Sequence, residues 1–454
     1  MSKSKPSLPR GTRDFGPEVS AKRNYIIGVI KEQFKKYCFS QLETPSMENL
    51  SVLTGKYGEE GDQLLFKILN SGDFLNKATA EDFNNGSKSF LPKVAEKGLR
   101  YDLTVPFARF VVMNQNDIAF PFKRFQIQPV WRADKPQKGR YREFYQCDAD
   151  IIGSKTLWNE AELTFLINDV FEKLNLNDYV IKINHREILF RLAEYVGLKG
   201  NEIPFCAEID KIDKIGSQKV LDNIVGIGAD SGKSNELLSL FEINDRETLL
   251  SKVTELVGKE SKGIQDLLSY FESIGQFGKE LKVELDLSLA RGLSYYTGII
   301  FEVKPTSVQM GSICGGGRYD DLTGIFGLPD VSGVGISFGL DRIYDVLGEL
   351  DLFPDAVGKS MDVLIVHFNE ETRRRGQEMV IKLRSEGIKA ELYPEQVKIK
   401  KQFNYADRVG APQVIVIGED ELKSGVYALK NMQTGEQQKA DLSQIISHLT
   451  KEAK

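Results

Sequence analysis

The chain has 454 residues, 41% hydrophobic and 28% charged, with no run of about 18 apolar residues and no apolar leader, so we expect a cytoplasmic protein of two or three domains without a membrane partner. Its 60 basic and 65 acidic side chains leave a formal net charge of -5, which excludes a surface that attracts nucleic acid as a whole. The 4 cysteines and 3 histidines are scattered singly, which argues against a disulfide framework, a transition metal held by protein side chains alone, and a Ser-His or Cys-His triad.

The first predicted element is an amphipathic helix over residues 20–38. Ile26, Ile30 and Phe34 recur at four-residue steps, and Ser20 is the predicted N-cap. A short extended segment, FSQLETPSMENL, follows and is interrupted at Pro45. Residues 71–97 are polar and contain glycine, which indicates a surface insertion.

Strands are predicted for LRYDLTVPFARFVV and for the two segments FKRFQIQPVW and REFYQCDADII, which flank the basic loop RADKPQKGRYREFYQ as a hairpin. A helix (155–174) and a strand (DYVIKIN) follow, then a mainly helical stretch, two further strands (KVELDLSL and GIIFEVKP), and a final block of β-α-β pattern. The predicted domains are a core in two parts, 1–185 and 281–355, a helical insertion at 186–280, and an α/β domain at 360–454.

Alternation along the hairpin predicts one polar face. Gln146, Asp148 and Asp150 share it in one strand, and Gln126, Gln128 and Arg132 share it in the other. Short carboxylates and amides beside a guanidinium are suited to holding a zwitterion and a phosphate. Two plainer interpretations remain open, namely a sheet with one face in solvent and a basic loop that is simply solvated.

Two more arginines stand in unusual positions. Arg291 lies beside Gly292 between two apolar strands, where an anion or a structural salt bridge would be needed to compensate its charge. Arg342 falls in the first turns of a predicted helix, where a cation opposes the helix dipole unless an anion binds there. Other nucleotide motifs fail, because Ile227 stands where a P-loop needs glycine and the glycines of CGGGRYDDL have the wrong spacing for a Rossmann fingerprint.

A series of stretches, in the order of the family, resembles the histidyl-tRNA synthetases, a family of class II aminoacyl-tRNA synthetases. PRGTRDFGPE resembles the N-terminal signature, FSQLETPSMENL motif 1, and RYDLTVPFARF the first amino-acid-binding strand. The basic loop with its flanking strands resembles motif 2, ARGLSYYTG with CGGGRYDDL the two histidine-specific peptides, and GVGISFGLDRI motif 3. The resemblance implies an α+β fold with a six-stranded antiparallel core, a helical insertion and a C-terminal α/β anticodon-binding domain.

The resemblance also implies roles for individual residues. Charge at the reacting phosphate would be stabilised by the catalytic arginines Arg132, Arg291 and Arg342. The positions that match the histidine site are Asp102, Thr104, Arg132, Gln146, Asp150, Arg291, Tyr295, Tyr296 and Tyr319. Those that match the ATP site are Arg132, Asp134, Phe144, Arg291 and Arg342. At the loop tip, Gln137, Lys138 and Arg140 are our hypothesis for contacts to the acceptor end of tRNA.

The activity implied is activation of L-histidine by ATP with Mg²⁺, followed by transfer of histidine to the 3′ end of its tRNA, in a homodimer built partly through motif 1. Asp102, Asp134 and Asp150 depart from the glutamates of many bacterial members. Two alternatives are weighed. One is a paralogue without aminoacylation that serves as a regulatory subunit. The other is a class II synthetase for threonine, proline or glycine, against which ARGLSYYTG and the pocket carboxylate Asp150 argue.

Overall fold

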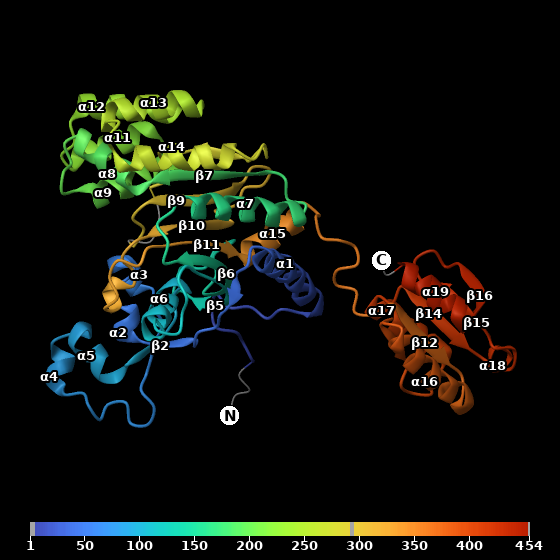
Figure 1. The fold of residues 1–454 in the computed structure, drawn as a ribbon. Helices are drawn as coiled ribbons and strands as arrows, with labels where there is room; N and C mark the ends of the chain where they lie inside the picture. The colour runs from blue at the N-terminus through green and yellow to red at the C-terminus, as the bar shows by residue number, and fades with distance from the viewer. Residues whose placement is uncertain (1–4, 291–294, 453–454) are drawn as a thin grey trace. The chain divides into compact units, whose positions relative to one another are not determined.

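The computed structural model describes residues 5–290 and 295–452, which form two compact units. The first comprises Met1–Asp14 with Arg23–Leu352, and the second comprises Phe15–Lys22 with Phe353–Lys454 (Figure 1). No helix in the described ranges is long and apolar enough to cross a bilayer.

The first unit is organised by a sheet of 8 strands in the order β1-β5-β6-β11-β10-β9-β7-β8. The six strands from β5 to β7 are antiparallel, while β1 and β8 add to the edges in parallel. The six-stranded antiparallel core is therefore confirmed. The strand bounds are β1 Ser40–Gln41, β5 Phe122–Trp131, β6 Glu143–Ile152, β7 Tyr179–His185, β8 Val283–Leu285, β9 Ile299–Pro305, β10 Cys314–Tyr319 and β11 Gly333–Gly339.

The β5–β6 hairpin has the predicted faces, but its polar face is not solvated. Gln126 lies opposite Asp148, and Arg124 lies opposite Asp150. The exposed fractions of these four residues are 0% for Gln126 and Arg124 and 2% for Asp148 and Asp150. A sheet face in solvent is excluded for this part of the hairpin, since polar groups buried to this extent need partners or a ligand.

The opposite, apolar face of the sheet is covered by helices α1 (Pro17–Lys36), α7 (Trp158–Lys173) and α15 (Leu340–Glu349) (Figure 1). Phe34 of α1 packs against Phe125 and Phe338, and Phe171 of α7 also contacts Phe338. These helices bury one face of the sheet, so the other face is left for the site.

Two sequence predictions near these elements were wrong. Helix α1 begins at Pro17, so Ser20 lies in its first turn and is not the N-cap; proline suits a first helical position because its missing N–H has no helical partner there. The predicted strand LRYDLTVPFARFVV is instead mostly helix α6, Thr104–Met113. An apolar run in the sequence does not distinguish a buried helix from a strand. At the start of helix α6, the Asp102 carboxylate accepts a hydrogen bond from Val105 N, as side chains that precede a helix often do.

Residues 71–97 lie mostly at the surface as predicted, but they carry two short helices and a small core in which Val94 and Ala95 pack with Leu50. A three-stranded sheet, β2-β4-β3, ties this segment to the unit. The elements here are β2 Met47–Asn49, α2 Leu50–Leu53, α3 Gly58–Gln63, β3 Lys67–Ile68, α4 Ala80–Asn84, α5 Ser87–Val94 and β4 Lys97–Leu99.

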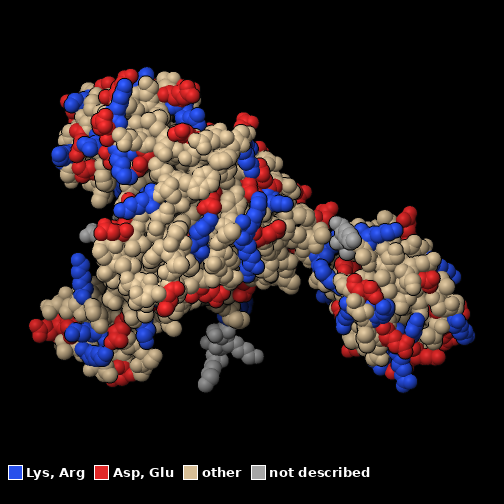
Figure 2. Space-filling model, in the orientation of Figure 1, with Lys and Arg blue, Asp and Glu red and all other residues tan. Residues whose placement is uncertain are grey.

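A helical segment follows β7, as the sequence predicted, and leads into β8. Basic and acidic side chains are interspersed on its visible surface (Figure 2), in keeping with the nearly balanced charge of the chain. Its helices are α8 Arg186–Tyr195, α9 Glu202–Ile209, α10 Ile212–Ile215, α11 Ser217–Gly226, α12 Ser231–Ser239, α13 Arg246–Val257 and α14 Lys262–Gly275.

The second unit has the predicted alternation of strands and helices around a five-stranded sheet of order β13-β12-β14-β15-β16. Its core gathers side chains from β12, β14 and α16, among them Val363, Ile415 and Met379. The elements are β12 Val363–His367, α16 Glu370–Ser385, β13 Ala390–Leu392, α17 Ile399–Val409, β14 Gln413–Ile417, α18 Glu419–Ser424, β15 Val426–Asn431, β16 Gln437–Asp441 and α19 Leu442–Glu452.

Candidate active site

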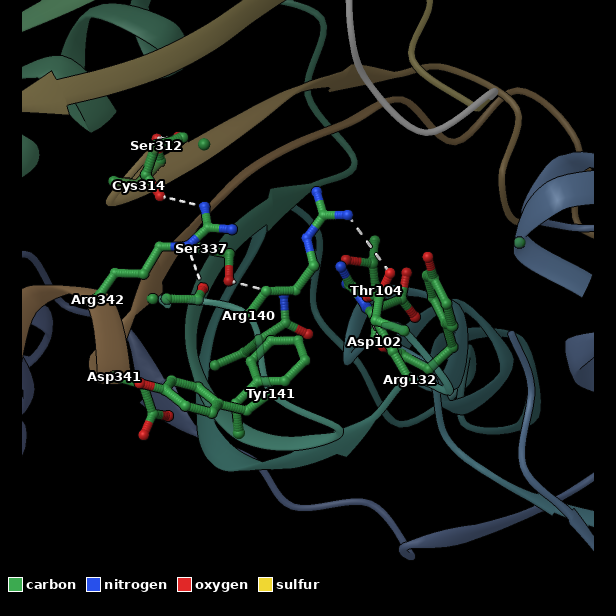
Figure 3. A pocket seen from close by; sticks show the side chains of 18 of the residues that line it. Asp102, Thr104, Arg132, Arg140, Tyr141, Ser312, Cys314, Ser337, Asp341 and Arg342 are labelled. Atoms are coloured by element: carbon green, nitrogen blue, oxygen red, sulfur yellow. Dashed lines mark hydrogen bonds and ion pairs between the residues drawn. The ribbon is translucent and has the colours of Figure 1, made fainter. Parts of the chain in front are cut away.

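A cavity of about 470 Å³ opens on the polar face of the sheet, between the hairpin, the start of α6 and the start of α15. Figure 3 shows Arg342 and Ser312 on one side of it and Arg132, Asp102 and Thr104 on the other. Ten of the predicted site residues line the cavity together: Asp102, Thr104, Arg132, Asp134, Arg140, Phe144, Gln146, Tyr295, Tyr296 and Arg342.

Other predicted residues lie elsewhere. Asp150 and Tyr319 are buried beneath the site and are not among the side chains that line the cavity. Lys138 is exposed at the tip of the motif 2 loop and pairs with Glu349 at 3.0 Å. Gln137 shares the tip turn, and Arg291 lies outside the described residues.

Glycines leave the space above the sheet open. In the pairing of β10 with β11, Gly315 lies opposite Ser337 and Gly317 opposite Gly335. A Cβ added to Gly315 would meet its nearest atom at 3.4 Å, an ordinary contact, whereas one on Gly335 would meet Asp150 Oδ1 at 2.0 Å. Gly315 therefore leaves room for a ligand, and Gly335 leaves room for the Asp150 carboxylate.

Asp102 is held in the cavity wall by hydrogen bonds from three residues. Its Oδ1 accepts hydrogen bonds from Val105 N at 3.1 Å and Tyr57 Oη at 3.0 Å, and its Oδ2 accepts from Tyr295 Oη at 3.3 Å. Burial raises the pKa of Asp102, and the hydrogen bonds together with the charge of Arg132 partly oppose that rise. The arrangement is suited to a cationic ligand group such as an ammonium.

Arg132 lies close to two aromatic rings. Its guanidinium carbon lies 4.2 Å from the centre of the Tyr101 ring and 5.2 Å from that of Phe144, and its Nε donates to Tyr101 O at 3.1 Å. The ring contacts and the hydrogen bond to Tyr101 O hold the guanidinium in the cavity wall, where it can bind a carboxylate or phosphate with its forked donors.

Arg342 is fixed from the opposite side. It is the third residue of α15, as the sequence predicted, and donates to Gly139 O at 2.8 Å and Ser312 O at 2.6 Å. Gly139, with φ of 70°, belongs to the tight turn at the loop tip, where the backbones of Gln137 and Arg140 bond each other. Motif 3 and the motif 2 loop thus support each other, and Arg140, paired with Asp134 at 3.6 Å, faces the cavity.

Beneath the cavity, Asp150 has partners within the protein. It pairs with Arg124 at 2.7 Å and accepts from Tyr319 Oη at 2.7 Å. Burial raises the pKa of Asp150, against the lowering effect of Arg124. Arg124 therefore neutralises a carboxylate that lies directly under the pocket.

The comparisons with known proteins agree with this geometry. The sequence profile described as Histidyl-tRNA synthetase matches residues 73–343, and that described as Anticodon binding domain matches residues 362–452. The histidine–tRNA ligase of Cytophaga hutchinsonii is 53% identical over 450 residues, which cover 98% of this chain and 99% of that protein. This chain belongs to the histidyl-tRNA synthetase family.

Two further members of the family support the assignment. The histidine–tRNA ligase of Bacteroides fragilis is 49% identical over 456 residues, covering 98% of this chain and 99% of that protein. The crystal structure of histidyl-tRNA synthetase from a Nostoc species superimposes with a TM-score of 0.83 at 27% identity and covers 99% of this chain and 100% of that one. The family resemblance predicted from these short motifs is confirmed.

Among the residues of the site that the sequence reasoning missed are Tyr57, Tyr101, Arg124 and Ser337. Arg124 could have been found, since it continues the alternation of Gln126 and Gln128 along the same strand face. Ser337 lies opposite Asp148 in the β6–β11 pairing, which no pattern in the sequence reveals. Tyr57 and Tyr101 come from segments whose pairing is set by the fold.

Proposed function

We propose that this protein is a histidine–tRNA ligase that activates L-histidine with ATP and then transfers the histidine to the 3′ end of its tRNA. The observation that carries the proposal is the pair Asp102 and Arg132 in one cavity. Asp102 supplies acceptors for an α-ammonium group, and Arg132 supplies a flat fork for the carboxylate and the α-phosphate.

In the first step, a carboxylate oxygen of histidine attacks the α-phosphorus of ATP in line and pyrophosphate leaves. Arg132 and Arg342, on two sides of the cavity, stabilise the negative charge, and we assign the same task to Arg291. Phe144 would stack under adenine. In the second step, a 3′-terminal hydroxyl of the tRNA attacks the carbonyl carbon and AMP leaves.

We propose Tyr296 and Asp150 for recognition of the imidazole, with Tyr295 and Tyr319 beside them. Tyr319 donates a hydrogen bond to Asp150. Because Asp150 is not among the residues that line the cavity, its carboxylate would act from beneath the cavity wall. A carboxylate near the imidazole favours its proton-donating form, which an apolar pocket could not select.

Mg²⁺ would neutralise charge on the triphosphate when bound. In the described ranges no three His, Cys, Asp or Glu side chains gather as a metal site, which fits an ion held mainly by phosphate oxygens and one or two carboxylates. Asp134 in the cavity wall is such a carboxylate.

The proposal includes tRNA binding by residues 362–452, a homodimer and a cytoplasmic location. A regulatory paralogue is not favoured, because relatives about half identical over nearly the whole chain are named histidine–tRNA ligases. The test is exchange of pyrophosphate into ATP with a panel of amino acids. We expect exchange with histidine alone and none in Arg291→Ala; equal exchange with threonine or proline would refute the proposal.

A further inference from the structure

Gln146 has a side-chain amide held from one end only. Its Nε2 donates to Ser337 Oγ at 3.0 Å, and both residues line the cavity. Its Oε1 is buried and has no hydrogen-bond partner within the described part of the chain. A buried acceptor left unpaired is costly, so a donor is expected to arrive with the ligand.

The direction of the Gln146 amide follows from Asp148. Ser337 lies opposite Asp148 in the β6–β11 pairing, which places its hydroxyl beside a buried carboxylate whose Oδ1 has no hydrogen-bond partner in the described part of the chain. A carboxylate can only accept, so the hydroxyl proton of Ser337 is directed to Asp148. Ser337 Oγ then has only lone pairs to offer, and Gln146 must present Nε2 to it.

We propose that Asp148 and Ser337 are positioning residues, which keep the Gln146 amide turned so that its oxygen is reserved for the α-ammonium of the amino-acid substrate. The inference rests on the proposed function, which supplies histidine as that substrate. Asp148 is itself kept in place by its surroundings: Arg124 attracts it, while Asp150 and Asp102 repel it. The strand spacing alone brings these groups together, because Gln146, Asp148 and Asp150 alternate along β6.

The test measures discrimination between compounds with and without the α-amino group. Wild type, Ser337→Ala and Ser337→Thr are assayed at pH 8, with histidine as substrate and with histidinol and 3-(imidazol-4-yl)propionate as competitive inhibitors. Threonine keeps the hydroxyl, and the facing Gly315 leaves room for its methyl group.

In Ser337→Ala the Gln146 amide can turn over. We expect the KM for histidine and the inhibition constant of histidinol to rise about tenfold, with the propionate and the KM for ATP little changed. Ser337→Thr should keep the wild-type ratio of the affinity for histidine to the affinity for the propionate. If Ser337 contributed only to stability, its loss would weaken the binding of all three compounds together.

Asp148→Asn provides a second test that keeps the volume of the side chain. The amide that this substitution introduces can donate to Ser337, so the Ser337 hydroxyl is no longer directed away from Gln146. The ratio of the affinity for histidine to the affinity for the propionate should therefore fall in Asp148→Asn too. A folded Ser337→Ala or Asp148→Asn with the wild-type ratio would overturn the inference. Wild type that shows no histidine-dependent exchange would instead overturn the proposed function.

Discussion

Arg13 and Asp341 are 328 residues apart in the sequence and form an ion pair in the structure. Arg23 of α1 pairs with the same carboxylate oxygen, and the other oxygen of Asp341 accepts from Tyr145 N at 3.1 Å. Arg13 also lies over the ring of Tyr141, 3.3 Å from its centre. The N-terminal signature thereby connects the motif 2 loop to the residue that precedes Arg342.

Loss of this connection is expected to weaken ATP binding. Arg13→Ala should raise the KM for ATP between about tenfold and a hundredfold, because the loop and Arg342 lose a common support. Pyrophosphate exchange as a function of ATP concentration measures the effect. Arg10→Ala, which removes an exposed arginine of the same segment, is the control and should behave as wild type.

Tyr57 is expected to contribute to the binding of histidine. Tyr57→Phe removes one donor from the buried Asp102 and should raise the KM for histidine about tenfold, since a hydrogen bond to a charged group is lost. The hydrogen bond lowers the pKa of Asp102, so its loss should also shift the acidic limb of the pH profile upward. Tyr195→Phe, which breaks an exposed hydrogen bond to Glu236, should change neither quantity.

Two glycines on neighbouring strands are expected to respond differently to alanine. Gly335→Ala drives a methyl group into Asp150 and should destabilise the fold by about 1–3 kcal/mol or more. Gly315→Ala fits the protein but narrows the cavity, so we expect a wild-type melting temperature with weaker ATP binding. Equal melting temperatures for the two variants would contradict this account.

The two basic residues at the loop tip, Lys138 and Arg140, should affect different steps of the reaction. Lys138 is exposed, so Lys138→Gln should reduce transfer to tRNA and leave histidine activation nearly unchanged. Arg140 faces the cavity and pairs with Asp134, so Arg140→Gln should reduce activation as well. Single-turnover transfer measured beside pyrophosphate exchange separates the two steps, and identical profiles for the two variants would count against the division.

Asp148 should make the stability of the protein depend on pH. Burial raises its pKa from an ordinary value near 4 to about 7, so the folded state binds the proton more tightly than the unfolded state. Stability is then lost as pH rises between these values and stays constant above them. Asp148→Asn should gain stability relative to wild type at pH 8 and gain least at pH 4, as urea unfolding at both values can measure.

Some failures of prediction have a clear physical cause. The segment after Asp102 was predicted as a strand because β-branched and apolar residues dominate it, yet tertiary packing makes it helix α6. The role of Asp150 in recognising the imidazole stays a prediction, and alternation placed this residue on the polar face of the sheet, as the structure shows. Alternation does not report depth, and the structure places Asp150 beneath the cavity with Arg124 and Tyr319.

The sequence by itself determined the hairpin, the face that carries Gln146 and Asp150, the helix that carries Arg342 and the family. These are local properties, set by the period of the strand, the order of motifs and the position of a helix start. Only the tertiary structure decided which distant residues meet: Tyr57 with Asp102, Arg13 with Asp341, and Ser337 with Gln146. Strand pairing and helix packing bring these partners together, and those depend on long-range contacts that no local pattern encodes.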